Sequence, residues 1–230
     1  MLEEFQTMFR LGMLHIADGT DHILFLMTLI LTAVDRTASL KEMGFGLLKL
    51  VTAFTVGHSL SLLAGVYQWV HLPSQPIEVA IALTILLSSV HLLKPIWRGW
   101  EFYVVLFFGL IHGLAFAGLM AEIETSTALL FVEVLGFNLG IEFFQLLVLL
   151  LFVPLLFFIL KGPWYQRFRS ISAYACLAAG CLWLFERLGL EIMWFSAFRW
   201  EPVYWLFLIV VILILAVLSC TFRDRTRSRV

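Results

Sequence analysis

The feature that most constrains this chain is a series of apolar runs, each long enough to cross a lipid bilayer as a helix. A membrane-spanning helix needs about 20 mostly apolar residues, and the runs that meet this criterion cover residues 11–34, 46–69, 76–94, 102–121, 130–160, 171–188 and 203–221. Only 13% of the 230 residues are charged, whereas a soluble domain has about 25%. The sequence therefore predicts an all-α polytopic membrane protein with about seven transmembrane helices.

Short connections separate these runs, so residues 1–230 are expected to form a single transmembrane bundle without a soluble domain. The fifth run exceeds the bilayer thickness and must tilt, kink near Pro154 or extend beyond the membrane. The chain starts with acidic residues and lacks a small-residue cleavage site, which indicates a retained first helix instead of a secretory signal peptide. A signal peptide already removed from further upstream is the alternative.

The distribution of lysine and arginine predicts the orientation of the bundle. With seven spans, one side carries only Arg10, Arg187 and Arg199. The other side carries Arg36, Lys41, Lys49, Lys94, Arg98, Lys161, Arg167, Arg169, Arg223, Arg225, Arg227 and Arg229. Because cytoplasmic loops are enriched in lysine and arginine, we expect an outside N-terminus and a cytoplasmic C-terminus in a bacterial inner membrane. Residues 223–230 then form a basic cytoplasmic tail, and these short basic segments do not suggest a nucleic-acid partner.

Polar and ionisable side chains interrupt several of the apolar runs. Such groups are costly inside a membrane and usually mark a site or a pathway. The first run contains HIADGTDH, and on a continuous helix His15, Asp18 and His22 share one face, with Asp21 beside them. The next four runs contribute His58, Glu78, His112, and Asn138 with Glu142. With the predicted topology, these positions lie between the outer surface and the middle of the membrane.

These side chains predict a divalent-metal site. Buried imidazoles and carboxylates need partners, and one divalent cation satisfies several of them at once. Imidazole combined with carboxylate suits nickel, cobalt, zinc or ferrous iron, and the lack of Cys and Met argues against cuprous copper. The candidate metal ligands are His15, Asp18, Asp21, His22, His58, His112, Asn138 and Glu142.

Other interpretations of the same residues stay open. A His or Asn in a membrane helix often makes only an interhelical hydrogen bond, and a His–Asp pair can relay protons without a metal. Glu78, near the predicted outer headgroups, is either part of the cluster or simply solvated. His91 lies near the cytoplasmic end of its run and is not expected to join the cluster.

At these residues the chain resembles the HupE/UreJ-type family of small membrane proteins. The family's first-helix pattern is His-Pro-x-x-Gly-x-Asp-His, and His15, Gly19, Asp21 and His22 match it. The segments TAFTVGHS, FGLIHG and FNLGIE resemble blocks of the branch that lacks the proline. The resemblance covers about residues 10–150, while the helices of 151–222 carry little that is diagnostic. It implies a link to nickel or cobalt uptake for hydrogenase and urease maturation.

Two positions depart from the nickel-linked members of this family. Ile16 stands in place of the proline, and its presence predicts a first helix without the irregularity that a proline introduces. After His112, where those members have a further histidine, this chain has Phe116. One potential imidazole ligand is therefore missing.

The leading hypothesis is a nickel- or cobalt-type divalent-cation permease. The ion would first meet the side chains of the HIADGTDH segment, and then His58, His112 and Glu142, with Asn138 supplying a neutral oxygen. The alternative is an intramembrane metal-dependent hydrolase or transferase, in which Asp21 or Glu142 acts as a base beside a metal-activated water. The near absence of ionisable groups from the inner half favours this alternative, because a transporter needs a second gate. An accessory subunit or metal sensor is a third hypothesis.

Overall fold

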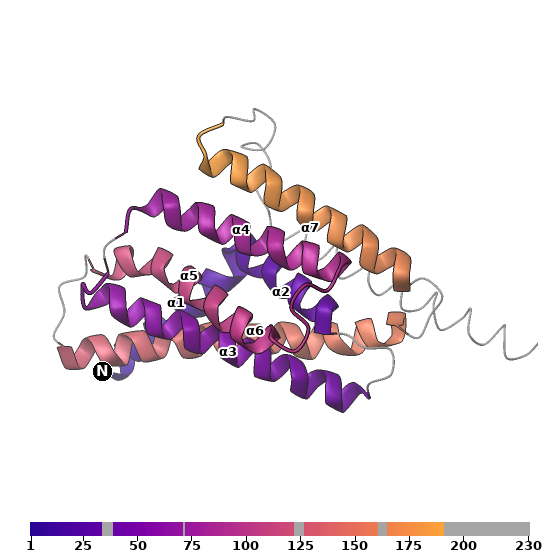
Figure 1. Ribbon diagram of the computed structural model, residues 1–230. Coiled ribbons are helices and arrows are strands. Elements are labelled where there is room, and N and C mark those ends of the chain that lie inside the picture. The colour runs from indigo at the N-terminus through magenta and orange to yellow at the C-terminus, as the bar shows by residue number, and fades with distance from the viewer. Residues whose placement is uncertain (34–38, 71, 122–126, 161–164, 191–230) are drawn as a thin grey trace, which may run out of the picture.

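The computed structural model describes residues 1–33, 39–70, 72–121, 127–160 and 165–190, and its regular structure in these ranges is entirely helical. The helices are α1 (Leu2–Asp18), α2 (Thr20–Ala33), α3 (Leu40–Val66), α4 (Ser74–Leu93), α5 (Glu101–Ala121), α6 (Thr127–Leu160) and α7 (Tyr165–Arg187). The closest pairings are α3 with α5, α1 with α6, and α4 with α7, and Figure 1 shows α7 lying along α4. The predicted all-α class is confirmed.

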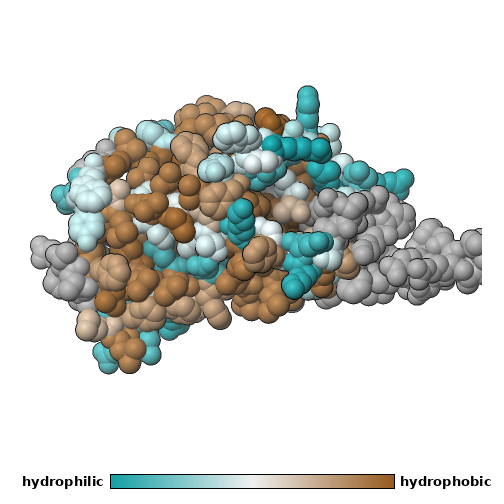
Figure 2. Space-filling view, turned by 60° about the horizontal axis from the view of Figure 1, so that its bottom comes forward, coloured by the Kyte–Doolittle hydropathy of each residue, from teal (hydrophilic) through white to brown (hydrophobic). Residues whose placement is uncertain are grey.

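Length and composition identify the helices that can cross a membrane. Among the described residues, α3, α4, α6 and α7 qualify singly, and the pair α1 and α2 qualifies together as one bent span. Helix α5 counts only as a shorter apolar helix, over Glu101–Phe116. The predicted span 203–221 lies outside the described residues. Large apolar side chains such as Leu150 stay exposed along the helices, and Figure 2 shows the apolar surface they create for contact with lipid.

The first predicted span is not one continuous helix. Helix α1 ends at Asp18, Gly19 is extended, and α2 starts at Thr20 with its axis turned by 73°. A Cβ on residue 19 would lie 2.6 Å from the His15 carbonyl oxygen and 2.7 Å from His22 Nδ1, so only glycine fits here. The helix is unbroken at Ile16, but the expectation of one continuous first helix is wrong, because the break occurs three residues later at Gly19.

The break also changes which side chains share a face. On a continuous helix Asp18 would lie between His15 and His22. In the structure Asp18 ends α1 and its side chain is exposed, while His22 turns into the bundle on α2. The expectation that His15, Asp18 and His22 line one helical face is thus wrong for Asp18.

Glycines set the distance between α3 and α5. A Cβ on Gly57 would lie 2.1 Å from the Leu106 carbonyl oxygen, and one on Gly113 would lie 2.2 Å from the His58 carbonyl oxygen. Small residues at such contacts let helix backbones approach closely in a membrane. The glycine-rich α5 therefore packs within the chain against α3, and this contact brings His58 and His112 to the same depth.

Gly57→Ala is expected to destabilise the bundle, because the added methyl group meets backbone that cannot move aside. Overpacking of this kind costs about 1–3 kcal/mol, which should lower the thermal unfolding midpoint in detergent by several degrees. The control is Gly44→Ala on the same helix, where a Cβ meets nothing within 4 Å. Equal midpoints for the two variants would contradict a tight α3–α5 contact.

Candidate metal centre

Four histidines from four different helices meet in the interior of the bundle. They are His15 on α1, His22 on α2, His58 on α3 and His112 on α5. The His15 and His22 ring centroids lie 4.6 Å apart, those of His22 and His112 5.2 Å, and those of His15 and His58 6.2 Å. His15 is half-buried and the other three are buried.

A hydrogen bond from α6 fixes the protonation pattern of His58. Its Nδ1 lies 3.2 Å from Asn138 Oδ1, and Asn138 Nδ2 donates to the Val134 carbonyl oxygen at 2.8 Å. Because the amide nitrogen already donates to α6, the amide oxygen is the group that accepts from His58. The proton of His58 then lies on Nδ1, and Nε2 keeps a lone pair.

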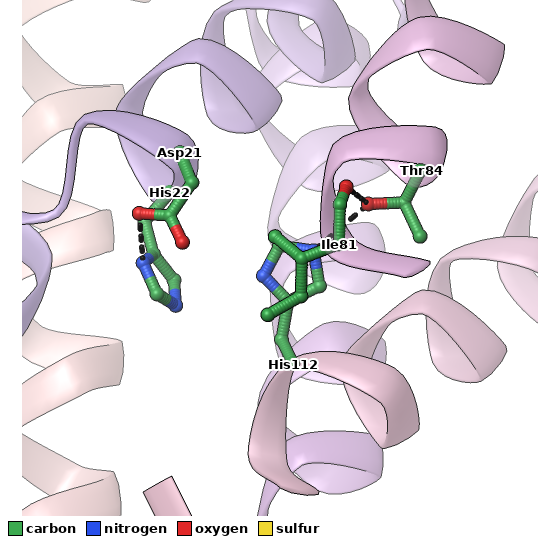
Figure 3. Close-up of polar contacts among 5 residues, drawn as sticks. All are labelled: Asp21, His22, Ile81, Thr84 and His112. Atoms are coloured by element: carbon green, nitrogen blue, oxygen red, sulfur yellow. Dashed lines mark hydrogen bonds and ion pairs between the residues drawn. The ribbon is translucent and has the colours of Figure 1, made fainter. Parts of the chain in front are cut away.

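Thr84 on α4 fixes the protonation pattern of His112 through a hydrogen bond to Nε2 instead of Nδ1. Thr84 Oγ1 donates to the Ile81 carbonyl oxygen at 2.6 Å, so its oxygen accepts from His112 Nε2 at 2.9 Å (Figure 3). The lone pair of His112 therefore lies on Nδ1. Ring nitrogens held in this way are typical of metal-binding histidines, whose second nitrogen donates to a neighbouring oxygen.

His22 is held by the residue before it. Its Nδ1 donates to Asp21 Oδ1 at 3.0 Å, which leaves the lone pair on Nε2 (Figure 3). Asp21 is 19% exposed, so its carboxylate links the buried imidazoles to the surface of the bundle.

One buried ring nitrogen of each of the four histidines has no hydrogen-bond partner among the described residues. These buried atoms are His15 Nε2, His22 Nε2, His58 Nε2 and His112 Nδ1. A buried polar atom without a partner costs about 1–3 kcal/mol, and here four such atoms gather in one place. A divalent cation would satisfy several of them at once, so the donor chemistry fits a metal ion.

The spacing of the groups agrees with this chemistry. His15, His22 and His58 form one set and Asp21, His22 and His112 a second, each with one ligand atom per residue within 4.8 Å of the others. Ligands on opposite sides of a zinc-sized ion, each about 2.1 Å away, are about 4.2 Å apart. His22 belongs to both sets and is the centre of the cluster.

The other predicted ligands lie outside both sets. Asp18 is exposed at the end of α1. Glu142 accepts a hydrogen bond from Thr52 Oγ1 at 2.9 Å, which ties α6 to α3. Asn138 holds His58 in place through its side-chain oxygen. Glu78 forms an ion pair with Arg187, 3.1 Å between Oε2 and Nη1, and so has a partner of its own.

The sequence did not point to Thr84, which holds His112, although a hydroxyl in the middle of an apolar run was a signal for it. Glu133 was also missed. It is a buried carboxylate on α6 with one oxygen that has no partner among the described residues, but it belongs to neither ligand set. Phe116, which replaces a histidine of the nickel-linked members, stacks on Phe137 at 4.2 Å and lies 5.0 Å from the His15 ring. The site therefore has an aromatic wall at this position.

A small cavity lies beside Asp21, at the end of the bundle that is predicted to face outward. It measures about 30 Å³ and is lined by Asp21, Glu78, Ile81, Ala82, Trp183 and Arg187. On the same measure of volume, a cavity needs about 10–15 Å³ to hold one water molecule. Asp21 thus contacts this cavity on one side and His22 on the other.

Comparison with known proteins identifies one family. The model of a family described as HupE / UreJ protein matches residues 1–187, which confirms the resemblance found in the sequence and extends it through α7. Neither the curated proteins nor the solved structures contain a match to the chain.

Proposed function

The chain belongs to the HupE/UreJ family, and from this premise we propose that it is a divalent-cation permease of the nickel or cobalt type. The ion would bind at the two overlapping ligand sets, His15 with His22 and His58, and Asp21 with His22 and His112. The observation that supports this most is the set of four buried imidazole nitrogens that have no partner among the described residues. On three of these histidines a hydrogen bond to the other ring nitrogen leaves the lone pair on the unpartnered one.

The donor set favours late first-row metals over magnesium and calcium. Imidazole ligands suit nickel, cobalt, zinc and iron, whereas magnesium and calcium prefer sites made only of oxygen. Asp21 supplies the one carboxylate of the two ligand sets, and its charge offsets part of the cation's charge inside the bundle. The family's association with nickel or cobalt uptake is the reason to prefer these two metals.

Aromatic side chains supply the inner barrier that a permease requires. Phe25 lies 5.6 Å from the His112 ring, 5.0 Å from Phe54 and 5.9 Å from Phe108. Phe108 in turn lines a cavity of about 810 Å³ at the other end of the bundle. The proposed inner gate is therefore apolar, so the lack of a second cluster of metal-binding side chains at that point does not argue against transport.

A metal-dependent hydrolase or transferase is less well supported. The cavity beside Asp21, at about 30 Å³, has room for water but not for a lipid or a peptide. A permease needs space only for the ion and its water.

The test uses purified full-length protein in vesicles that contain a metal-sensitive dye. External nickel or cobalt should enter faster than in protein-free vesicles, with a saturable rate, and excess magnesium or calcium should not compete. Equilibrium dialysis of the same preparation measures bound metal. About one tightly bound equivalent without any flux would contradict transport and favour the enzyme or sensor, while no bound metal would contradict every metal-based function.

A further inference from the structure

A second and larger cavity has none of the four clustered histidines in its lining and has a different chemistry. Its volume is about 810 Å³, and it is formed by the C-terminal ends of α2 and α4 and the N-terminal parts of α3, α5 and α7. Asp21, Glu78 and Arg187 lie at the opposite ends of α2, α4 and α7. The positive-inside distribution predicts that this cavity faces the cytoplasm.

Positive charge dominates the lining of this cavity. Among the described residues that line it, Lys49, Arg98 and Arg169 are basic and Glu101 is the one carboxylate. Among the described residues, the ion pairs involve none of these three cations. Lys49 Nζ instead lies 5.3 Å from the centre of the Phe102 ring. The cavity thus concentrates cations that have no carboxylate partner in the described part of the chain.

Arg169 is held in a fixed position and has one buried N–H group without a partner among the described residues. Its Nη2 donates to the Leu92 carbonyl oxygen at 2.6 Å, which anchors the guanidinium on the end of α4. Its Nε is buried and has no partner among the described residues. A positioned guanidinium with an unused N–H group is well suited to bind an oxyanion, and phosphate in particular.

Two helix ends add to this positive field. Helix α5 begins at Glu101 and α7 at Tyr165, and residues of both first turns line the cavity. The first N–H groups of a helix lack partners within the helix and carry a partial positive charge. Apolar side chains such as Leu29, Leu50 and Phe108 complete the walls. A cavity with cations and apolar walls suits an anionic headgroup that carries hydrocarbon.

We propose that this cavity binds a phosphate-bearing anion through Lys49, Arg98 and Arg169. Basic cavities between membrane helices on the cytoplasmic side bind the headgroups of anionic lipids, and a free phosphate or phosphate ester has the same recognition chemistry. This site is separate from the histidine cluster and does not depend on metal transport.

The experiment measures anion binding to the delipidated full-length protein in detergent. The probes are phosphatidylglycerol, phosphatidylcholine and inorganic phosphate, with bound lipid counted by native mass spectrometry and phosphate followed by calorimetry. We expect phosphatidylglycerol to bind at least about tenfold more tightly than phosphatidylcholine, and Arg169→Gln to weaken it about fivefold. Lys49→Gln should also weaken phosphatidylglycerol binding. Because this variant keeps the Arg169–Leu92 hydrogen bond, it tests the proposal even if Arg169→Gln fails to fold.

The matched control is Arg167→Gln, which removes the same charge from the same end of α7 but from a residue that does not line the cavity. Phosphatidylglycerol binding that depends on Arg169 and Lys49 but not on Arg167 supports a lipid site. Inorganic phosphate that binds with the same dependence supports a site for a free anion. Equal losses in all three variants, or no anion binding at all, would overturn the proposal.

Discussion

Replacing His22 with alanine is expected to abolish divalent-metal binding and transport. His22 is the residue shared by the two ligand sets, so its loss removes a ligand from both. Changes to groups that merely orient a ligand weaken metal binding about 10–100-fold, and we expect at least the upper end of that range for His22→Ala. The measurement is the dissociation constant for nickel or cobalt by competition with a chelating dye, followed by uptake into vesicles.

The matched control for His22→Ala is His91→Asn. His91 lies at the far end of α4, where its Nδ1 accepts from the Ile96 backbone N–H at 2.9 Å, and the asparagine oxygen can accept the same bond. We expect unchanged metal affinity for this variant and equal amounts of folded protein for both. Wild-type affinity in folded His22→Ala protein would rule out the histidine cluster as the metal site.

Asp21→Asn is expected to weaken metal binding about 10–100-fold. The asparagine oxygen can still accept the hydrogen bond from His22 Nδ1, so the ring stays oriented while the negative charge is lost. The affinity therefore falls for an electrostatic reason, and initial uptake rates at low metal concentration should fall with it. Both are measured with the dye-competition and vesicle assays.

Asp18→Asn provides the comparison for this prediction. Asp18 lies three residues before Asp21 but is exposed and outside both ligand sets, so its replacement should leave the affinity unchanged. A loss for Asp18→Asn as large as that for Asp21→Asn would mean that the bend at Gly19 is not present in the metal-bound protein.

Much of the architecture follows from hydrophobicity alone. Runs of about 20 apolar residues predict helices whatever their neighbours, and most of the predicted runs overlap α2 to α7. The histidines were identified because an imidazole in an apolar run is conspicuous and costly. Helical periodicity then placed His15 and His22 near each other, although the actual path between them is bent.

The roles of individual polar residues were harder to predict. Asn138 was expected to offer an oxygen to the metal, yet that oxygen accepts from His58. Thr84 escaped notice although it holds His112. Both roles depend on the rotation of one helix relative to another, and local sequence does not encode that rotation. The break at Gly19 was missed because glycine also occurs inside continuous membrane helices, as Gly57 does in α3, so its presence alone does not predict a break.

The one-residue joint at Gly19 would give the proposed metal site a mechanical role as well as a chemical one. His15 is on the arm before the joint and His22 on the arm after it. An ion bound to both rings would bridge the two arms and oppose any change in the angle between them. Metal occupancy and the angle of the first span would then be coupled, and each would report on the other.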